Sequence, residues 1–204
     1  MRISELAARS SVPVATIKYY LREELLPEGE RSSPTQAAYG EAHVQRLGVI
    51  RALVDAGVGI AGVRKVVALL EEPPENPSDL LGAAHAAVTP AVSSDLDLTA
   101  ALALLERMGG SAEHCFPDQV AAVAQALATL DRAGFAVPDA VMDAYVGHLG
   151  ALAEAELAAT PDSSIEDAVR YVVLGTALVE PLILALRRVG EQIAASRRFG
   201  AGSA

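Results

Sequence analysis

The sequence predicts a mainly α-helical protein in two parts, an N-terminal winged helix-turn-helix domain followed by an all-helical bundle domain. Alanine- and leucine-rich stretches, without the alternation typical of strands, fill much of the 204-residue chain. The charge is divided unevenly, with 9 Lys+Arg against 7 Asp+Glu in residues 1–70 and 7 against 19 in residues 71–204. This asymmetry indicates two separate roles. We expect domains at residues 1–72 and 78–204, joined by a linker at residues 73–77.

The N-terminal part begins with a short helix expected over residues 3–8 and a turn at residues 10–11. A second helix follows from Pro13, which has no N–H to lose and therefore suits a first helical position. Ile17 and Leu21, four residues apart, form its inner face. The opposite face carries small, hydrogen-bonding and cationic side chains, namely Ala15, Thr16, Lys18, Tyr19 and Arg22. Such a surface suits the major groove of DNA and the phosphates beside it.

Residues 27–40 are rich in Gly, Pro, Ser and Thr, and they predict either a short hairpin, the wing, or a disordered connector. A third helix comes next and ends at Gly57. Its expected inner face is formed by Val44, Leu47, Ile50 and Val54. A fourth helix is expected over residues 60–70, with a stripe of Ile60, Val63, Val67 and Leu70. The prolines at positions 73 and 74 end any helix there.

Two segments in this order, RISELAARSSVPVATIKYYLREELLP and TQAAYGEAHVQRLGVIRALVDAGVGIAGVRKVVALL, resemble the winged helix-turn-helix domain of MerR-family transcriptional regulators. The resemblance covers about residues 1–70. It implies a homodimer that places two recognition helices in successive major grooves of a near-palindromic promoter operator. Many members distort the spacer between promoter elements, so double-stranded DNA and RNA polymerase at the promoter are the implied partners.

The resemblance also assigns residues. Thr16 and Lys18 match groove-facing positions, and Tyr19 and Tyr20 match an aromatic pair of which one hydroxyl usually reaches phosphate. Arg31 and Tyr39 match wing positions. With Arg22, these form the predicted DNA-binding set. Two alternatives stay open: Tyr20 packs against the third helix, or Lys18 is an ordinary solvated charge. Ala38 departs from the family, in which an Arg often stands beside the wing tyrosine, so we expect this wing to hold the DNA backbone less firmly.

The second part predicts a series of helices over residues 78–88, 98–108, 117–133 and 138–159, the first of them ended by Pro90. A last region runs from residue 163 to 196 with a kink or break before Pro181, and Ser163 and Glu166 have the spacing of a capping box. The segment VEPLILALRRVGEQIAASRRF weakly resembles TetR-family ligand-binding domains. That resemblance implies a four-helix dimer interface formed by the final two helices. The alternative is that they are the central helices of a monomeric bundle.

A small organic effector is the expected ligand of this part. The candidate effector-binding residues are Phe116, Met142, Tyr145, His148 and Tyr171, each of which could instead be core. We expect no metal and no cofactor, because Cys115 is the single cysteine and with His114 would supply two ligands of a site that needs more. We also expect a cytoplasmic protein with no membrane segment, since residues 171–186 are short for a bilayer and are interrupted by Glu180 and Pro181.

The function expected from these features is an effector-responsive, DNA-binding transcriptional regulator. The alternative is a small-molecule sequestering protein in which DNA binding is secondary. An enzyme is not expected, because the sequence has no glycine-rich phosphate loop, no nucleophile motif and no carboxylate pair set beside a histidine.

Overall fold

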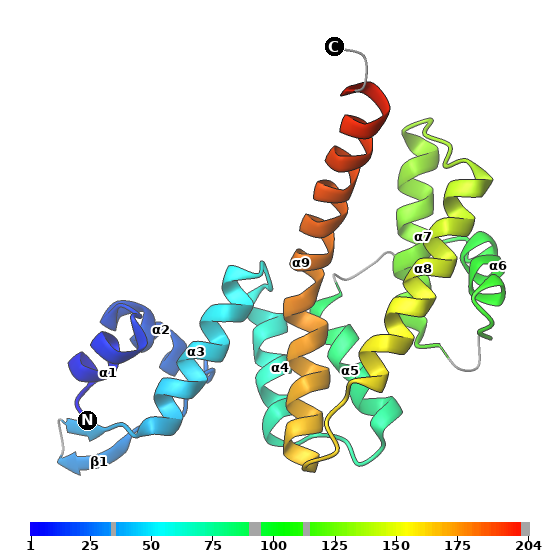
Figure 1. Cartoon of the computed structure of the whole chain (residues 1–204). Helices are drawn as coiled ribbons and strands as arrows, with labels where there is room; N and C mark the ends of the chain where they lie inside the picture. Colours follow the sequence, from blue (N-terminus) through cyan, green and yellow to red (C-terminus); the bar gives the residue numbers. More distant parts are fainter. Residues whose placement is uncertain (34–35, 90–94, 112–114, 201–204) are drawn as a thin grey trace. The chain divides into compact units, whose positions relative to one another are not determined.

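The computed structural model describes residues 1–33, 36–89, 95–111 and 115–200, and these residues form nine helices and a two-stranded hairpin (Figure 1). They fall into two compact units. The first contains Met1–Pro73 together with Val173–Ala204, and the second contains Pro74–Val172. The mainly α fold with a helix-turn-helix head and a helical body is confirmed. The predicted domain boundaries stay a prediction; the end of the chain belongs to the same compact unit as the head, whereas the sequence placed it with the body.

The head comprises the elements from Met1 to Pro73. Helix α1 packs against α2 and α3, and α3 packs against α4. The strands β1 and β2 pair antiparallel, with Glu30 opposite Ala38 and Arg31 opposite Ala37, so the predicted wing is a hairpin. The bounds are α1 Ile3–Ser10, α2 Val14–Arg22, β1 Glu30–Ser33, β2 Gln36–Ala38, α3 Glu41–Asp55 and α4 Ile60–Glu71.

The core of the head is made of aliphatic side chains from every helix and from the segment after α2. Its fully buried members are Leu6, Ile17, Leu25, Leu26, Leu47, Ile50, Leu53, Val63 and Val66. The sequence placed Val54 on the inner face of α3, but Val54 is exposed and Leu53 is buried instead. The buried residues Leu47, Ile50 and Leu53 are three positions apart, so the buried side of α3 rotates slowly around the helix along its length. This suits a helix that contacts both α1 and α4.

The ends of the helices in the head follow local backbone chemistry. Ser11 adopts a left-handed conformation (φ 54°) after α1. Pro13 precedes α2 in an extended conformation, so the helix begins at Val14 and not at Pro13 as predicted. Gly57 (φ 90°) ends α3 as expected, because its N–H bonds Val54 O at 3.0 Å while Val58 N–H bonds Leu53 O at 2.9 Å. These two bonds form a Schellman motif.

The second unit contains α5 (Pro77–Val88), α6 (Thr99–Arg107), α7 (Pro117–Arg132) and α8 (Asp139–Ala158). Helix α7 packs against α5 and α6. The core between α6 and α7 is built on small residues, Ala101, Val120 and Ala124, with Leu102, Leu105 and Leu127 packed around them. Pro90, predicted to end α5, lies outside the described residues; α5 ends before it at Val88.

Helix α9 (Ile165–Phe199) is one helix of 35 residues that contains Pro181. The predicted pair of final helices is therefore wrong, and of the kink or break predicted before Pro181 the break does not occur, since strong helix formers on both sides of Pro181 keep the helix continuous. Its N-terminal cap is also shifted by one residue from the prediction: Asp167 N–H bonds Ser164 Oγ at 3.0 Å. By length and composition alone α9 could cross a membrane, and 17% of its most apolar window is buried.

Candidate nucleic-acid interface

Helix α2 presents a compact polar and cationic face. Lys18 and Arg22 are exposed, while Thr16 and Tyr19 are half-buried. The guanidinium carbon of Arg22 lies 6.0 Å from the centroid of the Tyr19 ring, at the outer range of a cation–π contact. The ring therefore favours an Arg22 side chain that lies along the helix surface. The structure thus brings four of the predicted DNA-binding side chains onto a single helix.

The arginines elsewhere in the helices of the head are paired with carboxylates, whereas Arg22 of α2 is not. The pairs are Arg9–Glu41, Arg46–Glu71, Arg51–Asp55 and Arg64–Glu23. Within the described part of the chain, neither Lys18 nor Arg22 has a carboxylate within 4.0 Å. A phosphate that approaches α2 would meet two cations that need not first give up a partner.

The paired arginines also hold α2 at both of its ends. Before α2, Arg51 of α3 donates to Ser11 O at 3.3 Å. After α2, Arg64 of α4 donates to Glu23 O at 3.2 Å, and Arg46 of α3 donates to Leu25 O. These bonds satisfy carbonyls in the segments next to α2 and fix the helix on α3 and α4. The exposed face of α2 is therefore held in a fixed position by α3 and α4, which reduces the conformational entropy lost when α2 binds a ligand.

Two predicted DNA-binding tyrosines are core residues in this structure. Tyr20 is 7% exposed and Tyr39 is 8% exposed, so neither ring forms part of an open surface. Burial, with further contributions from Tyr19 and Asp55, raises the pKa of Tyr20. The alternative that Tyr20 packs inside the head therefore describes it better. Both rings are buried by packing against residues far away in the sequence, so the local sequence pattern could not predict their burial.

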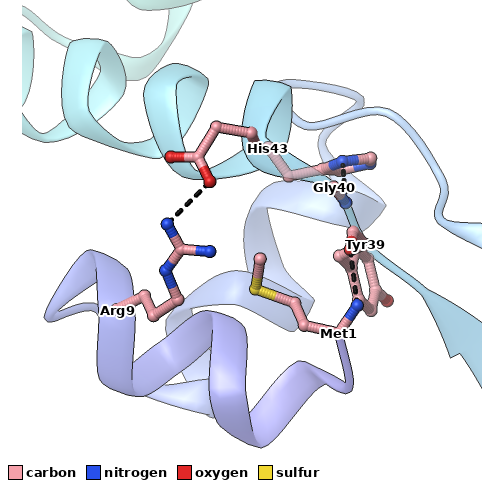
Figure 2. A network of polar contacts seen from close by, with 6 residues as sticks. Met1, Arg9, Tyr39, Gly40 and His43 are labelled. Carbon is pink, nitrogen blue, oxygen red and sulfur yellow. Dashed lines mark hydrogen bonds and ion pairs between the residues drawn. The ribbon is translucent and has the colours of Figure 1, made fainter.

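The wing is held at its base by bonds to Met1, and Glu30 and Arg31 of β1 are exposed. The N-terminal nitrogen of Met1 donates to Tyr39 O at 2.7 Å, and Tyr39 N–H donates to Met1 O at 2.9 Å. Beside this pair, Gly40 N–H donates to His43 Nδ1 at 3.1 Å, as Figure 2 shows. Arg31 is exposed, and its guanidinium nitrogen lies 3.9 Å from a carboxylate oxygen of Glu28. This ion pair is weak, so Arg31 stays available to contact a ligand.

The five predicted effector-binding residues occupy three separate places. Phe116 lies against Gly82 of α5, where an added Cβ would come within 2.0 Å of the ring. Tyr171 donates its hydroxyl to Glu156 O at 3.2 Å. Met142, Tyr145 and His148 lie on α8, and Nδ1 of His148 is 2.7 Å from Ala144 O. The hollow along α9, lined by Gln192, Ile193, Ser196 and Arg197, includes none of the five.

A metal site has no support within the described ranges, which contain no group of three or more His, Cys, Asp or Glu placed to hold an ion. Cys115 is half-buried beside the core between α6 and α7. His114, its neighbour and the second ligand considered from the sequence, lies outside the described residues.

Residues 1–70, which carry this α2 face and the wing, match the family of MerR HTH regulatory proteins. They are a MerR-family helix-turn-helix domain. This MerR-type head is 33% identical over 70 residues to the mercuric resistance operon regulatory protein of Bacillus cereus, a match that covers 34% of this chain and 53% of that protein. The chain thus spans about half the length of the curated relative that it matches.

The whole chain also resembles a solved structure. SCO5550 from Streptomyces coelicolor A3(2), which carries the provisional name of a transcriptional regulator, is 30% identical with a TM-score of 0.65. The match covers 98% of each chain, so it includes the helical body as well as the MerR-type head.

Proposed function

We propose that the protein is a transcriptional regulator whose MerR-type head binds a near-palindromic promoter operator, as a homodimer, next to RNA polymerase. The observation that carries this proposal is the face of α2, where Lys18 and Arg22 are exposed and unpaired while the arginines around them are engaged in the fold. The MerR-family match of residues 1–70 and the full-length likeness to SCO5550 support the same function.

The charge of the chain agrees with a localised DNA contact. The formal net charge is −10, so the protein as a whole repels a polyanion. Residues 1–70 carry a small positive balance, and Lys18 and Arg22, which have no carboxylate within 4.0 Å, share α2. Because screening limits the repulsion from distant carboxylates to about one Debye length, roughly 8 Å at physiological salt, short-range contacts from α2 dominate.

The second compact unit supplies the effector-responsive part of the proposal. A head that reads DNA does not need Pro74–Val172, which has its own core between α6 and α7. A small organic, largely apolar effector is the class of ligand that suits a unit poor in aromatic and charged core residues. Phe116 and Tyr171 already have intramolecular roles, so in this proposal they hold the unit together and the effector is bound elsewhere in it.

The test compares two lysines in the full-length protein. Lys18→Ala removes an exposed, unpaired cation from α2, and Lys65→Ala removes an exposed cation from α4 as the matched control. Binding to a DNA fragment from upstream of the protein's own gene is measured by fluorescence anisotropy over a range of salt. We expect Lys18→Ala to weaken binding by about 1–3 kcal/mol if Lys18 contacts a base, or to lower the salt slope by about one if it contacts phosphate.

Equal affinity and equal salt slope in the two variants would refute the role of the α2 face. A wild-type protein that does not bind this DNA fragment at modest salt, but binds small organic molecules through its body, would favour sequestration over regulation.

A further inference from the structure

Two long helices each carry an apolar stripe that is left uncovered by the compact unit to which it belongs. The distal stripe of α9 consists of Leu182, Leu186, Val189 and Ile193, which are between 48% and 60% exposed. The α8 stripe consists of Val141, Tyr145, Leu149 and Leu152, which are between 36% and 51% exposed. Helix α8 has no buried residue along its 20 positions. Water-soluble helices gain most of their stability from burying such a face, so each stripe needs a partner.

We propose that the distal stripe of α9 docks on the α8 stripe of a second copy of this chain. By twofold symmetry the exchange occurs twice, with α9 of each copy on α8 of the other. This inference rests on the proposed dimer and names the surfaces that form it. It also gives Tyr145, predicted to bind an effector, a place in the contact between copies.

The α8 of the same copy cannot cover the whole distal stripe. Tyr171 of α9 is hydrogen-bonded to Glu156 O near the end of α8, so α9 starts beside that end, after a turn at residues 159–164. If α8 ran back along α9, its 20 residues, about 30 Å at 1.5 Å each, would reach only to about residue 188 of α9. Because α9 continues without a break to Phe199, Ile193 lies beyond this reach.

Charge favours α8 over a second α9 as the docking surface. Helix α8 carries four carboxylates and no Lys or Arg, and of these Asp143 is paired with Arg107. Residues 180–199 of α9 carry four arginines and two glutamates. Pairing two distal stripes would bring together two surfaces of net positive charge, whereas pairing with α8 brings together opposite charges.

The spacing of the two stripes fits when the helices run in the same direction. Leu182, Leu186 and Ile193 lie 41 positions after Val141, Tyr145 and Leu152. In this register Gly190 stands opposite Leu149, which lets a large side chain fill the space over a small one. At the end of the contact Arg197 stands opposite Glu156, so the charges of this pair are complementary.

The register is tested by disulfide trapping in the full chain with Cys115→Ser as background. The pair Leu152→Cys with Ile193→Cys is expected to give a covalent dimer under mild oxidation, seen on a non-reducing gel. The matched control, Leu152→Cys with Leu184→Cys, uses an apolar residue of similar exposure on the opposite side of α9 and is expected to stay uncrosslinked. A crosslink within one chain would overturn the proposal, as would a dimer formed by Ile193→Cys alone, since that means α9 pairs with α9.

Solution mass provides the second measurement. Leu186→Gln is expected to raise the dimer dissociation constant at least tenfold in light scattering or sedimentation, while Leu184→Gln leaves it unchanged. Equal effects of the two variants would overturn the proposal. So would a wild-type monomer that cosediments with phosphatidylcholine vesicles through α9. Loss of the dimer with retained, weaker binding of the head to one half-site separates this inference from the proposed role of the α2 face, which is refuted by equal DNA affinity and salt slope in Lys18→Ala and Lys65→Ala.

Discussion

Gly82 is expected to tolerate alanine poorly, although glycine inside a helix normally benefits from that change. In an open helix Gly→Ala stabilises by about 0.5–1 kcal/mol, because alanine restricts the unfolded chain and favours the helix. At Gly82 the added Cβ would lie 2.0–2.3 Å from three atoms of the Phe116 ring. These distances are far below van der Waals contact, so Gly82→Ala must push the ring away.

The cost can be worked out from the burial of Phe116, whose side chain is 37% exposed. An aromatic side chain buries roughly 150–250 Å² when it is covered. Swinging this ring out would therefore return about 100 Å² to water, which costs about 2.5 kcal/mol at about 25 cal/mol per Å². After subtracting the about 0.5–1 kcal/mol that alanine adds over glycine in a helix, Gly82→Ala should lower the free energy of unfolding by about 1.5–2 kcal/mol.

Urea unfolding of the full chain, followed by circular dichroism, measures this change. The matched control is Gly147→Ala on α8, where a Cβ meets nothing within 4 Å and the expected effect is a small stabilisation. In a Phe116→Ala background the sign at Gly82 should reverse, because the clash is gone. If Gly82→Ala stabilises the protein as much as Gly147→Ala does, the ring does not rest on Gly82 and the reasoning is refuted.

Two further predictions concern the head. Arg46→Met should lower the free energy of unfolding by about 2 kcal/mol, because it leaves the part-buried carbonyl of Leu25 without its hydrogen-bond donor. Glu71→Gln removes only an exposed ion pair with Arg46 and should lower the free energy of unfolding by under about 1 kcal/mol. Equal losses of the two variants in urea unfolding would contradict this assignment. The raised pKa of Tyr20 adds stability that is complete below the ordinary tyrosine pKa of 10.0 and is lost as pH rises through the higher folded value. In Tyr20→Phe this alkaline loss should shrink when unfolding is measured between about pH 9 and 11, and an unchanged pH dependence would argue against it.

Features encoded within a few residues were predictable from the sequence. Gly57 adopts positive φ and ends α3, as the sequence predicted, and Gly109 and Gly134 adopt positive φ just after α6 and α7 in the same way. The wing hairpin and the exposed cations of α2 were also expected. Each of these depends on local backbone preference or on helical periodicity, which a short window of sequence contains.

The features that were missed depend on residues far apart in the chain. Tyr39 is buried where its backbone pairs with Met1, 38 positions away. Arg64 reaches Glu23 across 41 positions, and no local pattern marks either partner. Pro181 was expected to kink or break the last helix, because proline costs about 3 kcal/mol in a helix interior. The structure keeps the helix, so that local rule was outweighed by the rest of α9.

The division of the cations in the head separates two responses to ionic strength. Arg46, Arg51 and Arg64 bond backbone carbonyls at short range, and such contacts are weakly screened by salt. Lys18 and Arg22 face water, and contacts from them to phosphate weaken steeply as counterions compete. Rising salt should therefore release the head from a polyanion long before it loosens the fold that presents α2. Binding to a polyanion and stability of the fold thus depend on different cationic residues of the head. A mutation can therefore change either property while the other is preserved.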